Sequence, residues 1–307
     1  MQYYFAPLEG LTDRVYRALH HKYFPGVNRY YTPFFSPTVH RQLTPREAKE
    51  LPPANTIGAT VIPQLLTKVP EDFIWMAQQC KDLGYTQVNL NIGCPSGTVT
   101  AKGKGSGMLR EPEVLDRFLD QIFQHTPLPV SIKTRIGFTS PEEFPALLEI
   151  FNRYPLAELI IHPRVRSAFY AGAVDMEAFS YAVQNAHVPL CYNGDLRSLE
   201  DVEKINAQFP AVQSVMIGRG LIADPGMLTP GGTGLSQLEA FYTELTEAYV
   251  ENFGGSRNAM FRMKEHWGML QHRFDGGEKL FKALRKATDL SEYRALTQQI
   301  FHTLTLK

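Results

Sequence analysis

Short apolar runs recur about every thirty residues along roughly the first 220 residues of the chain. They are rich in β-branched and aromatic residues, which favour strands. The runs cover residues 3–7, 29–34, 60–65, 87–92, 129–134, 159–162, 189–193 and 214–217. This spacing is typical of the strand–helix units that build a parallel sheet.

Segments with helical periodicity lie between most of these runs. Several begin at residues that favour helix starts, such as Pro70 and Pro112 in a first turn and Ser140 and Ser198 ahead of acidic residues. The predicted helices are residues 14–21, 73–83, 114–124, 144–154 and 202–208. Proline-rich residues 36–54 predict a long irregular loop with one short helix. Eight strands alternating with helices predict an α/β fold, a (β/α)₈ TIM barrel rather than an open sheet.

The pattern changes after a glycine-rich break at residues 224–234. Beyond it the chain shows helical periodicity and no further strand pattern. The helices are predicted at residues 236–252, 257–274, 276–288 and 291–303. We therefore expect a barrel domain over residues 1–230 and a small all-helical domain over residues 236–307.

Composition narrows the class of protein. Hydrophobic residues make up 44% and charged residues 20%, which are values of a folded globular chain. The formal net charge is zero, so a polyanionic partner would need a local basic face. The three cysteines are an odd number in a chain too long to need disulfides, which favours a reducing, cytoplasmic setting. They show no C-x-x-C spacing, so we expect no metal site. No apolar run approaches the ~20 residues of a membrane span and no signal peptide is evident, so we expect no membrane partner. A monomer is the default expectation.

Polar groups gather where the predicted strands end. Barrel enzymes place their sites at the carboxyl ends of the strands, and buried polar groups cost free energy unless they are paired. These strand ends carry Glu9, Gln64, Asn91, Cys94, Lys133, Arg135, His162, Arg164, Asn193, Asp195 and Arg219. The pattern predicts a ligand site at that mouth of the barrel. Lys133 is either a cation facing the ligand or an amine on the barrel rim. The other polar residues at the strand ends favour the first interpretation.

The most distinctive stretch covers residues 88–109. An apolar strand runs into Cys94, which stands between a glycine and a proline, and a glycine-rich loop follows at residues 97–107. One interpretation is a thiol delivered to a fixed place beside a loop that closes over a ligand. The other is a buried cysteine followed by a flexible turn.

The last two strand ends predict a phosphate site. Residues 193–195 and 218–220 read Asn-Gly-Asp and Gly-Arg-Gly, and both can offer free backbone N–H groups, with the charge of Arg219 beside them. Barrels commonly bind phosphate after strands seven and eight. Ordinary tight turns are the alternative for each glycine taken alone.

Together these segments closely resemble the tRNA-dihydrouridine synthases. The resemblance is carried by residues 6–13 (APLEGLTD), 89–95 (NLNIGCP), 130–137 (VSIKTRIG), 161–164 (IHPR), 192–196 (YNGDL) and 215–220 (VMIGRG). It covers about the first 225 residues, and the segment around Cys94 is the specific one. The chain departs from the family pattern at Asn89, where Asp is usual, at residues 163–165 after His162, and at residues 66–67 after Gln64.

The resemblance implies an FMN site across the barrel mouth, with NADPH as the reductant. It implies that the FMN phosphate binds Gly194, Gly218 and Arg219, and that the ring lies near Pro7, Leu8, Gln64, Lys133 and His162. Glu9, Asn193 and Asp195 complete the expected cofactor-binding set. Cys94 would then protonate C5 of a uracil while hydride reaches C6. In that setting Cys94 is a proton donor rather than a nucleophile, and residues 97–107 are a mobile lid.

A tRNA substrate implies further contacts. Basic residues are dense near the C-terminus, and phosphate contact is the favoured interpretation once RNA is the substrate. The expected RNA-binding residues are Asn91, Arg135, Arg164, Arg262, Lys264, Lys279, Lys282, Arg285 and Lys286. For Phe261 and Trp267 we favour a helix face over an apolar core.

Two other functions stay open at this point. One is an FMN barrel that acts on a free pyrimidine, like dihydroorotate dehydrogenase, for which a basic helical domain has no use. The other is a tRNA-binding protein with a decayed active site, against which the intact Cys94, Lys133 and His162 argue. The sequence does not indicate which uridine would be modified.

Overall fold

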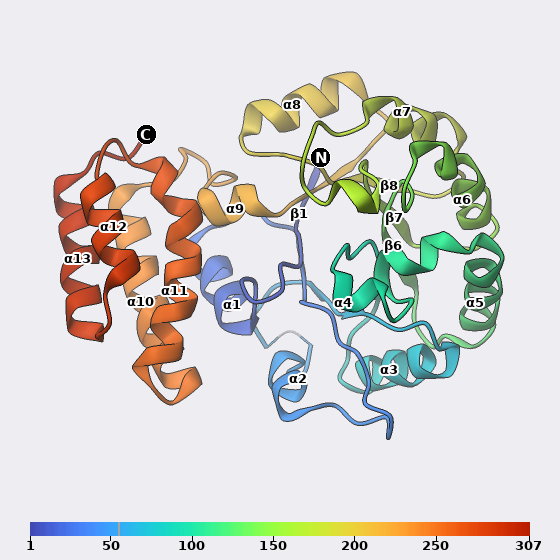
Figure 1. Cartoon of the computed structure of the whole chain (residues 1–307), viewed down its shortest axis with the longest axis horizontal. Coiled ribbons are helices and arrows are strands. Elements are labelled where there is room, and N and C mark those ends of the chain that lie inside the picture. The colour runs from blue at the N-terminus through green and yellow to red at the C-terminus, as the bar shows by residue number, and fades with distance from the viewer. Residues whose placement is uncertain (55) are drawn as a thin grey trace.

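The computed structural model describes residues 1–54 and 56–307, and its centre is a parallel sheet (Figure 1). Nine strands are present in these residues: β1 Gln2–Phe5, β2 Arg29–Tyr31, β3 Val61–Ile62, β4 Gln64–Leu65, β5 Val88–Ile92, β6 Val130–Arg135, β7 Glu158–His162, β8 Leu190–Tyr192 and β9 Ser214–Ile217. Their order is β3-β2-β1-β9-β8-β7-β6-β5-β4, and neighbouring strands in this order are parallel. The predicted barrel is therefore confirmed.

The third predicted strand is split by Pro63 into β3 and β4. Proline has no N–H to give to a sheet ladder, but the carbonyl of Pro63 still accepts from the N–H of Asn89 at 2.9 Å. β3 and β4 stand at the two ends of the strand order, and along the chain only Pro63 separates them. The sheet consequently closes on itself, and nine observed strands correspond to eight predicted ones.

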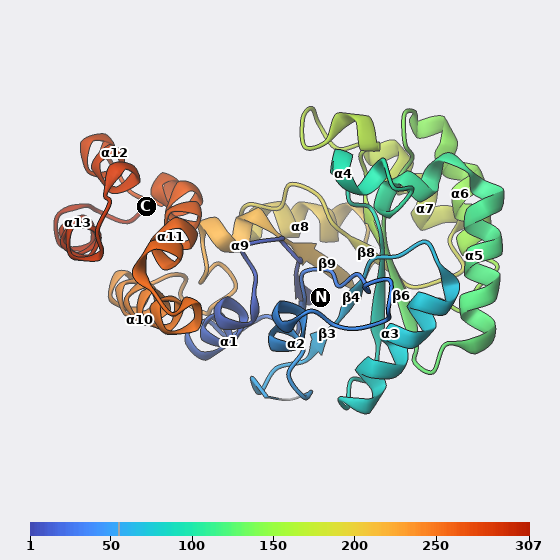
Figure 2. The ribbon, with the colours of Figure 1, turned by 60° about the horizontal axis from the view of Figure 1, so that its bottom comes forward.

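Helices surround this sheet (Figures 1 and 2). They are α1 Arg14–Tyr23, α2 Pro45–Glu50, α3 Pro70–Asp82, α4 Gly97–Thr100, α5 Pro112–His125, α6 Phe144–Phe151, α7 Met176–Asn185, α8 Leu199–Gln208 and α9 Arg219–Ala223. The five predicted helices correspond to α1, α3, α5, α6 and α8, whereas α7 and α9 were not predicted. The loop predicted at residues 36–54 is also confirmed, since α2 is the one helix in these residues.

The helical faces explain how the barrel is covered. In α5 the buried residues are Leu115, Phe118, Leu119 and Ile122, which follow the i, i+3, i+4, i+7 spacing of one helix face. Pro112 occupies the first turn of this helix, where a missing N–H costs nothing. The apolar stripe packs on the sheet, so the polar ends of the strands are left to line the mouth.

Four helices follow the barrel: α10 Leu235–Phe253, α11 Ser256–Leu270, α12 Glu278–Lys286 and α13 Leu290–Thr303. The predicted helix 257–274 ends earlier, because a 3₁₀ turn, Gln271–Arg273, follows α11. Trp267 is buried among these helices and donates its indole N–H to the Tyr293 hydroxyl at 2.8 Å. Its predicted core role is confirmed, whereas Phe261 is exposed.

The helical segment packs on the first βα unit of the barrel through α10 and α11. Tyr16 of α1 meets Phe241 edge to face at 5.6 Å and stacks on His266 at 4.7 Å between ring centroids. At Gly10 an added Cβ would lie 2.7 Å from Nη1 of Arg262, so the missing side chain makes room for this guanidinium. Among the described residues, no helix is long and apolar enough to cross a membrane.

Candidate active site

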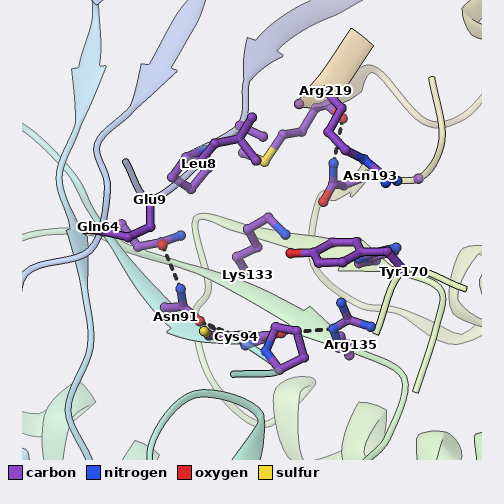
Figure 3. Close-up of a pocket in the computed structure, with 18 of the residues that line it drawn as sticks. Leu8, Glu9, Gln64, Asn91, Cys94, Lys133, Arg135, Tyr170, Asn193 and Arg219 are labelled. Atoms are coloured by element: carbon purple, nitrogen blue, oxygen red, sulfur yellow. Dashed lines mark hydrogen bonds between the residues drawn. The ribbon is translucent and has the colours of Figure 1, made fainter. Parts of the chain in front are cut away.

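A cavity lies at the carboxyl ends of the strands, where the sequence predicted a site (Figure 3). Fourteen of the predicted residues line it: Pro7, Leu8, Glu9, Gln64, Asn91, Cys94, Lys133, Arg135, His162, Asn193, Gly194, Asp195, Gly218 and Arg219. They come from the ends of seven of the eight βα units. The expected clustering at one mouth therefore holds in the structure.

A chain of amide side chains supports the floor of this cavity. The Gln64 amide donates to Asn89 Oδ1 at 2.8 Å, and Asn91 Nδ2 donates to Gln64 Oε1 at 2.7 Å. Asn91 Oδ1 in turn accepts from the N–H of Gly93 at 3.1 Å and of Cys94 at 2.9 Å. Both polar atoms of Asn91 thus bond to groups of the protein, and its expected contact with RNA stays a prediction. Asn89, where the family usually has Asp, is a buried link in this chain.

The Cys94 turn is held from its other side by the glycine-rich loop. Ser106 donates its N–H and its hydroxyl to the Cys94 carbonyl, at 3.1 and 2.7 Å. Gly105 has φ +57°, and an added Cβ would lie 3.0 Å from that same carbonyl. This loop contains α4, Gly97–Thr100, and a 3₁₀ helix, Gly105–Arg110, joined by a short turn. Motion of this segment as a lid stays a prediction.

The thiol of Cys94 is partly buried and faces the cavity. Burial raises its pKa above the ordinary value, and the nearby Lys133 and Arg135 only partly oppose this shift. A raised pKa keeps the thiol protonated at neutral pH, which suits a proton donor. Cys80 and Cys191, by contrast, are buried in the protein core.

Lys133 supplies a cation in the middle of the cavity, with Gln64 on one side and Tyr170 on the other (Figure 3). Burial and the neighbouring Arg135 lower the pKa of Lys133 to about 8. Its amine has no hydrogen-bond or ion-pair partner among the described residues. A half-buried amine without a protein acceptor fits an anionic or carbonyl-bearing ligand, and its interpretation as a rim amine is therefore not favoured.

His162 and Arg164 form a pair at the end of β7. The guanidinium donates from Nη1 to His162 Nε2 at 3.1 Å and from Nη1 and Nη2 to the Asp195 carboxylate. Only 2% of the Arg164 side chain is exposed. Nη1 and Nη2 of Arg164 thus have partners within the protein, and its expected contact with RNA stays a prediction. Burial and the cations of Lys133, Arg135 and Arg164 lower the pKa of His162 to about 2, so the ring is neutral.

Asp195 connects the His162–Arg164 pair to Arg219, which belongs to the predicted phosphate site. Its carboxylate also accepts from Nη2 of Arg219 at 3.0 Å, and its backbone has φ +41°. Two guanidinium groups lower the pKa of Asp195, with the Arg164 hydrogen bond as the main cause. Asp195 therefore orients Arg164 and Arg219, and a direct contact with a cofactor phosphate would place like charges together.

Backbone donors are available beside Arg219. The N–H groups of Gly194 and Gly218 have no acceptor among the described residues. Asn193 donates its side-chain amide to the Met216 carbonyl at 2.7 Å, which ties the ends of β8 and β9. An added Cβ at Gly220 would overlap the Leu196 carbonyl oxygen, so only glycine lets α9 begin this close to the Asn193–Leu196 turn. These donors and the Arg219 charge fit a phosphate group.

Arg135 and Tyr170 form the remaining wall. Arg135 is buried and donates to the carbonyls of Gly93 and Val165, both at 3.0 Å, while its guanidinium lies 5.4 Å from the Tyr170 ring. The Arg219 guanidinium lies 5.0 Å from the same ring. Tyr170 was not predicted, because it stands in an irregular segment without periodicity. Its one signal is an aromatic pair, Phe169 and Tyr170, shortly after a strand end.

The C-terminal basic residues divide into two groups. Arg262 faces Gly10 and lies 3.9 Å from the Asp13 carboxylate, and Lys264 donates to the Ala287 carbonyl. Both residues thus make contacts within the protein, and their expected contact with RNA stays a prediction. The other four, Lys279, Lys282, Arg285 and Lys286, are exposed on α12. In both ribbon views α12 lies at the end of the molecule opposite α5 (Figures 1 and 2).

The closed parallel barrel and the polar pocket at its carboxyl strand ends place the chain among the TIM-barrel proteins. Solved structures share this fold: morphinone reductase has a TM-score of 0.51 at 13% identity, covering 74% of this chain and 84% of its own. The old yellow enzyme homologue from Zymomonas mobilis has a TM-score of 0.50 at 11% identity, covering 73% and 86%. The model of the dihydrouridine synthase (Dus) family matches residues 4–303, so the chain belongs to this family.

Curated relatives agree with the family. The tRNA-dihydrouridine(16) synthase of Escherichia coli K12 is 31% identical over 240 residues, which cover 74% of each chain. The probable tRNA-dihydrouridine synthase 1 of Synechocystis is 26% identical over 323 residues, which cover 98% of this chain and 86% of the relative. The resemblance inferred from the sequence is thereby confirmed.

Proposed function

We propose that this protein is a tRNA-dihydrouridine synthase that reduces the C5=C6 bond of a uridine in tRNA with FMN and NADPH. The observation that carries the proposal is the meeting of Cys94 and Lys133 in one cavity, on the ends of the paired strands β5 and β6. A protonated thiol and an amine without a protein acceptor are the two groups that a flavin-dependent reduction of uracil needs. Membership of the Dus family and the names of the curated relatives support the substrate.

The residues of the cavity divide into a phosphate end and a ring end. Arg219 and the free N–H groups of Gly194 and Gly218 would hold the FMN phosphate, with Asp195 orienting the arginine. Pro7, Leu8 and Gln64 would border the flavin ring. When bound and reduced by NADPH, FMN supplies the hydride that reaches C6 of the uracil.

The protein itself would contribute a positive charge that stabilises the reaction and a proton for the uracil. Lys133 would stabilise negative charge on the bound ring. Cys94 gives its S–H proton to C5 as the new C–H bond at C6 forms, and the thiolate is then reprotonated from solvent. The sum consumes the uridine, NADPH and one proton, and it yields dihydrouridine and NADP⁺. Because FMN would lie within the mouth, the uridine would have to leave its stack to reach Cys94.

We further propose uridine 16 as the position that is modified. Curated relatives from several bacteria carry this position in their names, and the one from Escherichia coli K12 shares 31% identity with this chain. The proposed domain boundaries, 1–230 and 236–307, place the exposed cations of α12 in the RNA-binding part. How that part orients the tRNA would select the position.

The test is dihydrouridine mapping by reverse transcription or mass spectrometry in tRNA from a strain that lacks the protein. Loss of dihydrouridine at position 16, restored by the wild-type chain, is the expected result. Loss at another position would refute the choice of uridine 16 and leave the activity standing. Unchanged dihydrouridine throughout, together with a purified protein that takes up no FMN, would refute the function. Reduction of free pyrimidines in preference to tRNA would favour the dihydroorotate dehydrogenase-like alternative.

A further inference from the structure

Four side chains outside the cavity form an alternating row of cations and aromatic rings. The Arg110 guanidinium lies 4.0 Å from the centre of the Phe138 ring, and the Arg166 guanidinium lies 5.3 Å from the same ring. Arg166 is also 4.8 Å from the centre of the Phe169 ring. These distances are all within the range of attractive cation–π contacts. We call Arg110, Phe138, Arg166 and Phe169 the Arg–Phe row.

The Arg–Phe row is fastened to the turn that carries Cys94. Arg166 donates from Nε to the Pro95 carbonyl at 3.1 Å and from Nη2 to the Thr100 hydroxyl at 3.4 Å. Arg110 ends the 3₁₀ helix Gly105–Arg110, whose first residues pack on the Cys94 carbonyl. The row therefore has a fixed place against the Cys94 turn, at the rim of the cavity that Pro95 lines.

Its two positive charges are not neutralised. Neither Arg110 nor Arg166 forms an ion pair within the part of the chain that the structure describes. Glu143, which lies next to Phe138, uses its carboxylate to accept from the N–H groups of Phe138, Thr139 and Ser140. Two guanidinium groups without a carboxylate partner attract an anion.

Phe169 ends the row in an unusual state. The residue is 43% exposed, and its backbone has φ +50° and ψ −100°. A bulky residue rarely adopts positive φ, and such strain persists where the surroundings or a function require it. An exposed ring held in this way offers a flat apolar face next to two free cations.

We propose that the Arg–Phe row binds the nucleotide that neighbours the reacting uridine, with Phe169 stacking on its base and the arginines on its phosphate. The proposal rests on the tRNA-modifying function proposed above. Stacking faces joined to cations are the features that hold single-stranded RNA. A uridine drawn into the mouth leaves its neighbours unstacked at the rim, and the row lies at that rim. The nucleotide half of NADPH has the same chemistry, and the experiment separates the two.

The experiment uses FMN-loaded enzyme and tRNA transcripts with 2-aminopurine at either nucleotide flanking the modified uridine. Stacking on Phe169 quenches this fluorophore in the complex. Phe169→Leu keeps the apolar volume and removes the aromatic face, and Phe169→Tyr restores the face. Phe261→Ala is the matched control, because Phe261 is also exposed and lies within about 6 Å of two cations, Arg257 and Lys264, outside the cavity.

We expect Phe169→Leu to relieve the quenching and to weaken tRNA binding about tenfold. Phe169→Tyr and Phe261→Ala should keep the quenching, and the rate of flavin reduction by NADPH without RNA should be unchanged in all three. Quenching that survives Phe169→Leu would overturn the proposal. So would a change in NADPH affinity with tRNA binding intact, which would assign the row to the reductant. A wild-type enzyme that makes no dihydrouridine would instead refute the function on which the proposal rests.

Discussion

Arg164 donates a hydrogen bond from Nη1 to Nε2 of His162 over 3.1 Å. Arginine can only donate, so Nε2 must be the unprotonated nitrogen of this neutral ring. The remaining proton therefore sits on Nδ1, which has no partner among the described residues. His162 lines the cavity, so this N–H is available to a bound ligand.

With lysine in place of Arg164, the His162 ring should no longer be fixed in one tautomer. A lysine is a single point charge and cannot hold both His162 and Asp195. We expect FMN affinity to fall about tenfold and the ¹⁵N shifts of His162 to show a mixture of tautomers. Arg153→Lys, on an exposed pair with Asp116, should change neither quantity. Unaltered ¹⁵N shifts in Arg164→Lys would show that Arg164 does not set the tautomer.

Cys94→Ala should separate the two halves of the reaction. NADPH oxidation should persist, whereas dihydrouridine formation should fall about 10²- to 10⁴-fold because the proton donor is lost. Cys80→Ala serves as the control, since Cys80 is a buried thiol of α3 outside the cavity. Single-turnover assays with reduced enzyme and tRNA provide the measurement. Full activity in Cys94→Ala would remove Cys94 from its proposed role.

FMN binding should take up protons at pH values above about 8. In the free protein the pKa of Lys133 is about 8, so its amine loses a proton as the pH rises through this value. A bound anion favours the ammonium form and raises that pKa, so affinity should decrease with rising pH. Calorimetry in two buffers of different ionisation enthalpy measures the proton uptake. Lys133→Gln should abolish it, and an unchanged uptake in that variant would point to another group.

The exposed cations of α12 should contribute to tRNA affinity in a salt-dependent way. Lys282→Gln and Arg285→Gln should each lower the slope of log affinity against log salt by about 1. Lys204→Gln on α8 is the control, because Lys204 is exposed but paired with Glu200. Identical slopes for the α12 variants and the wild type would place the RNA elsewhere.

Gly220→Ala should destabilise the protein and weaken FMN binding. The added methyl group would overlap the Leu196 carbonyl, and relief requires a shift of the turn, at a cost of about 1–3 kcal/mol. Gly268→Ala provides the opposite case, since Gly268 lies within α11 and an added Cβ meets nothing within 4 Å. It should stabilise by about 0.5–1 kcal/mol. Denaturant unfolding measures both, and equal effects would contradict the packing argument.

The barrel was predictable because its signals are local. Strand spacing, apolar helix faces and capping residues each lie within one segment, and the site follows from the rule that barrel sites lie at carboxyl strand ends. α7 was missed although its signal was present, since Asp175 caps this helix through the N–H of Ala178. α9 is too short to show a period.

The direction of a charged side chain was not predictable. Arg164 follows His162 by two residues. The neighbouring sequence does not indicate whether its side chain points outward or toward Asp195. That turn depends on the φ of +41° at Asp195 and on a loop closed by the N–H of Asp175 on the Pro163 carbonyl, 2.7 Å away. The contacts of Asn91 with Gln64 and of Arg262 with Asp13 were missed for the same reason, because these partners are distant in sequence.

The contact between Gly10, Asp13 and Arg262 bears on how the gene can be shortened. Asp13 caps α1 through the N–H of Tyr16, and burial raises the pKa of its carboxyl to about 6 even with Arg262 nearby. A barrel expressed alone would lose this arginine and also uncover Tyr16, which packs on Phe241 and His266. Residues 1–230 should therefore be insoluble when produced without the helices, and complementation by two separate fragments should require their co-expression.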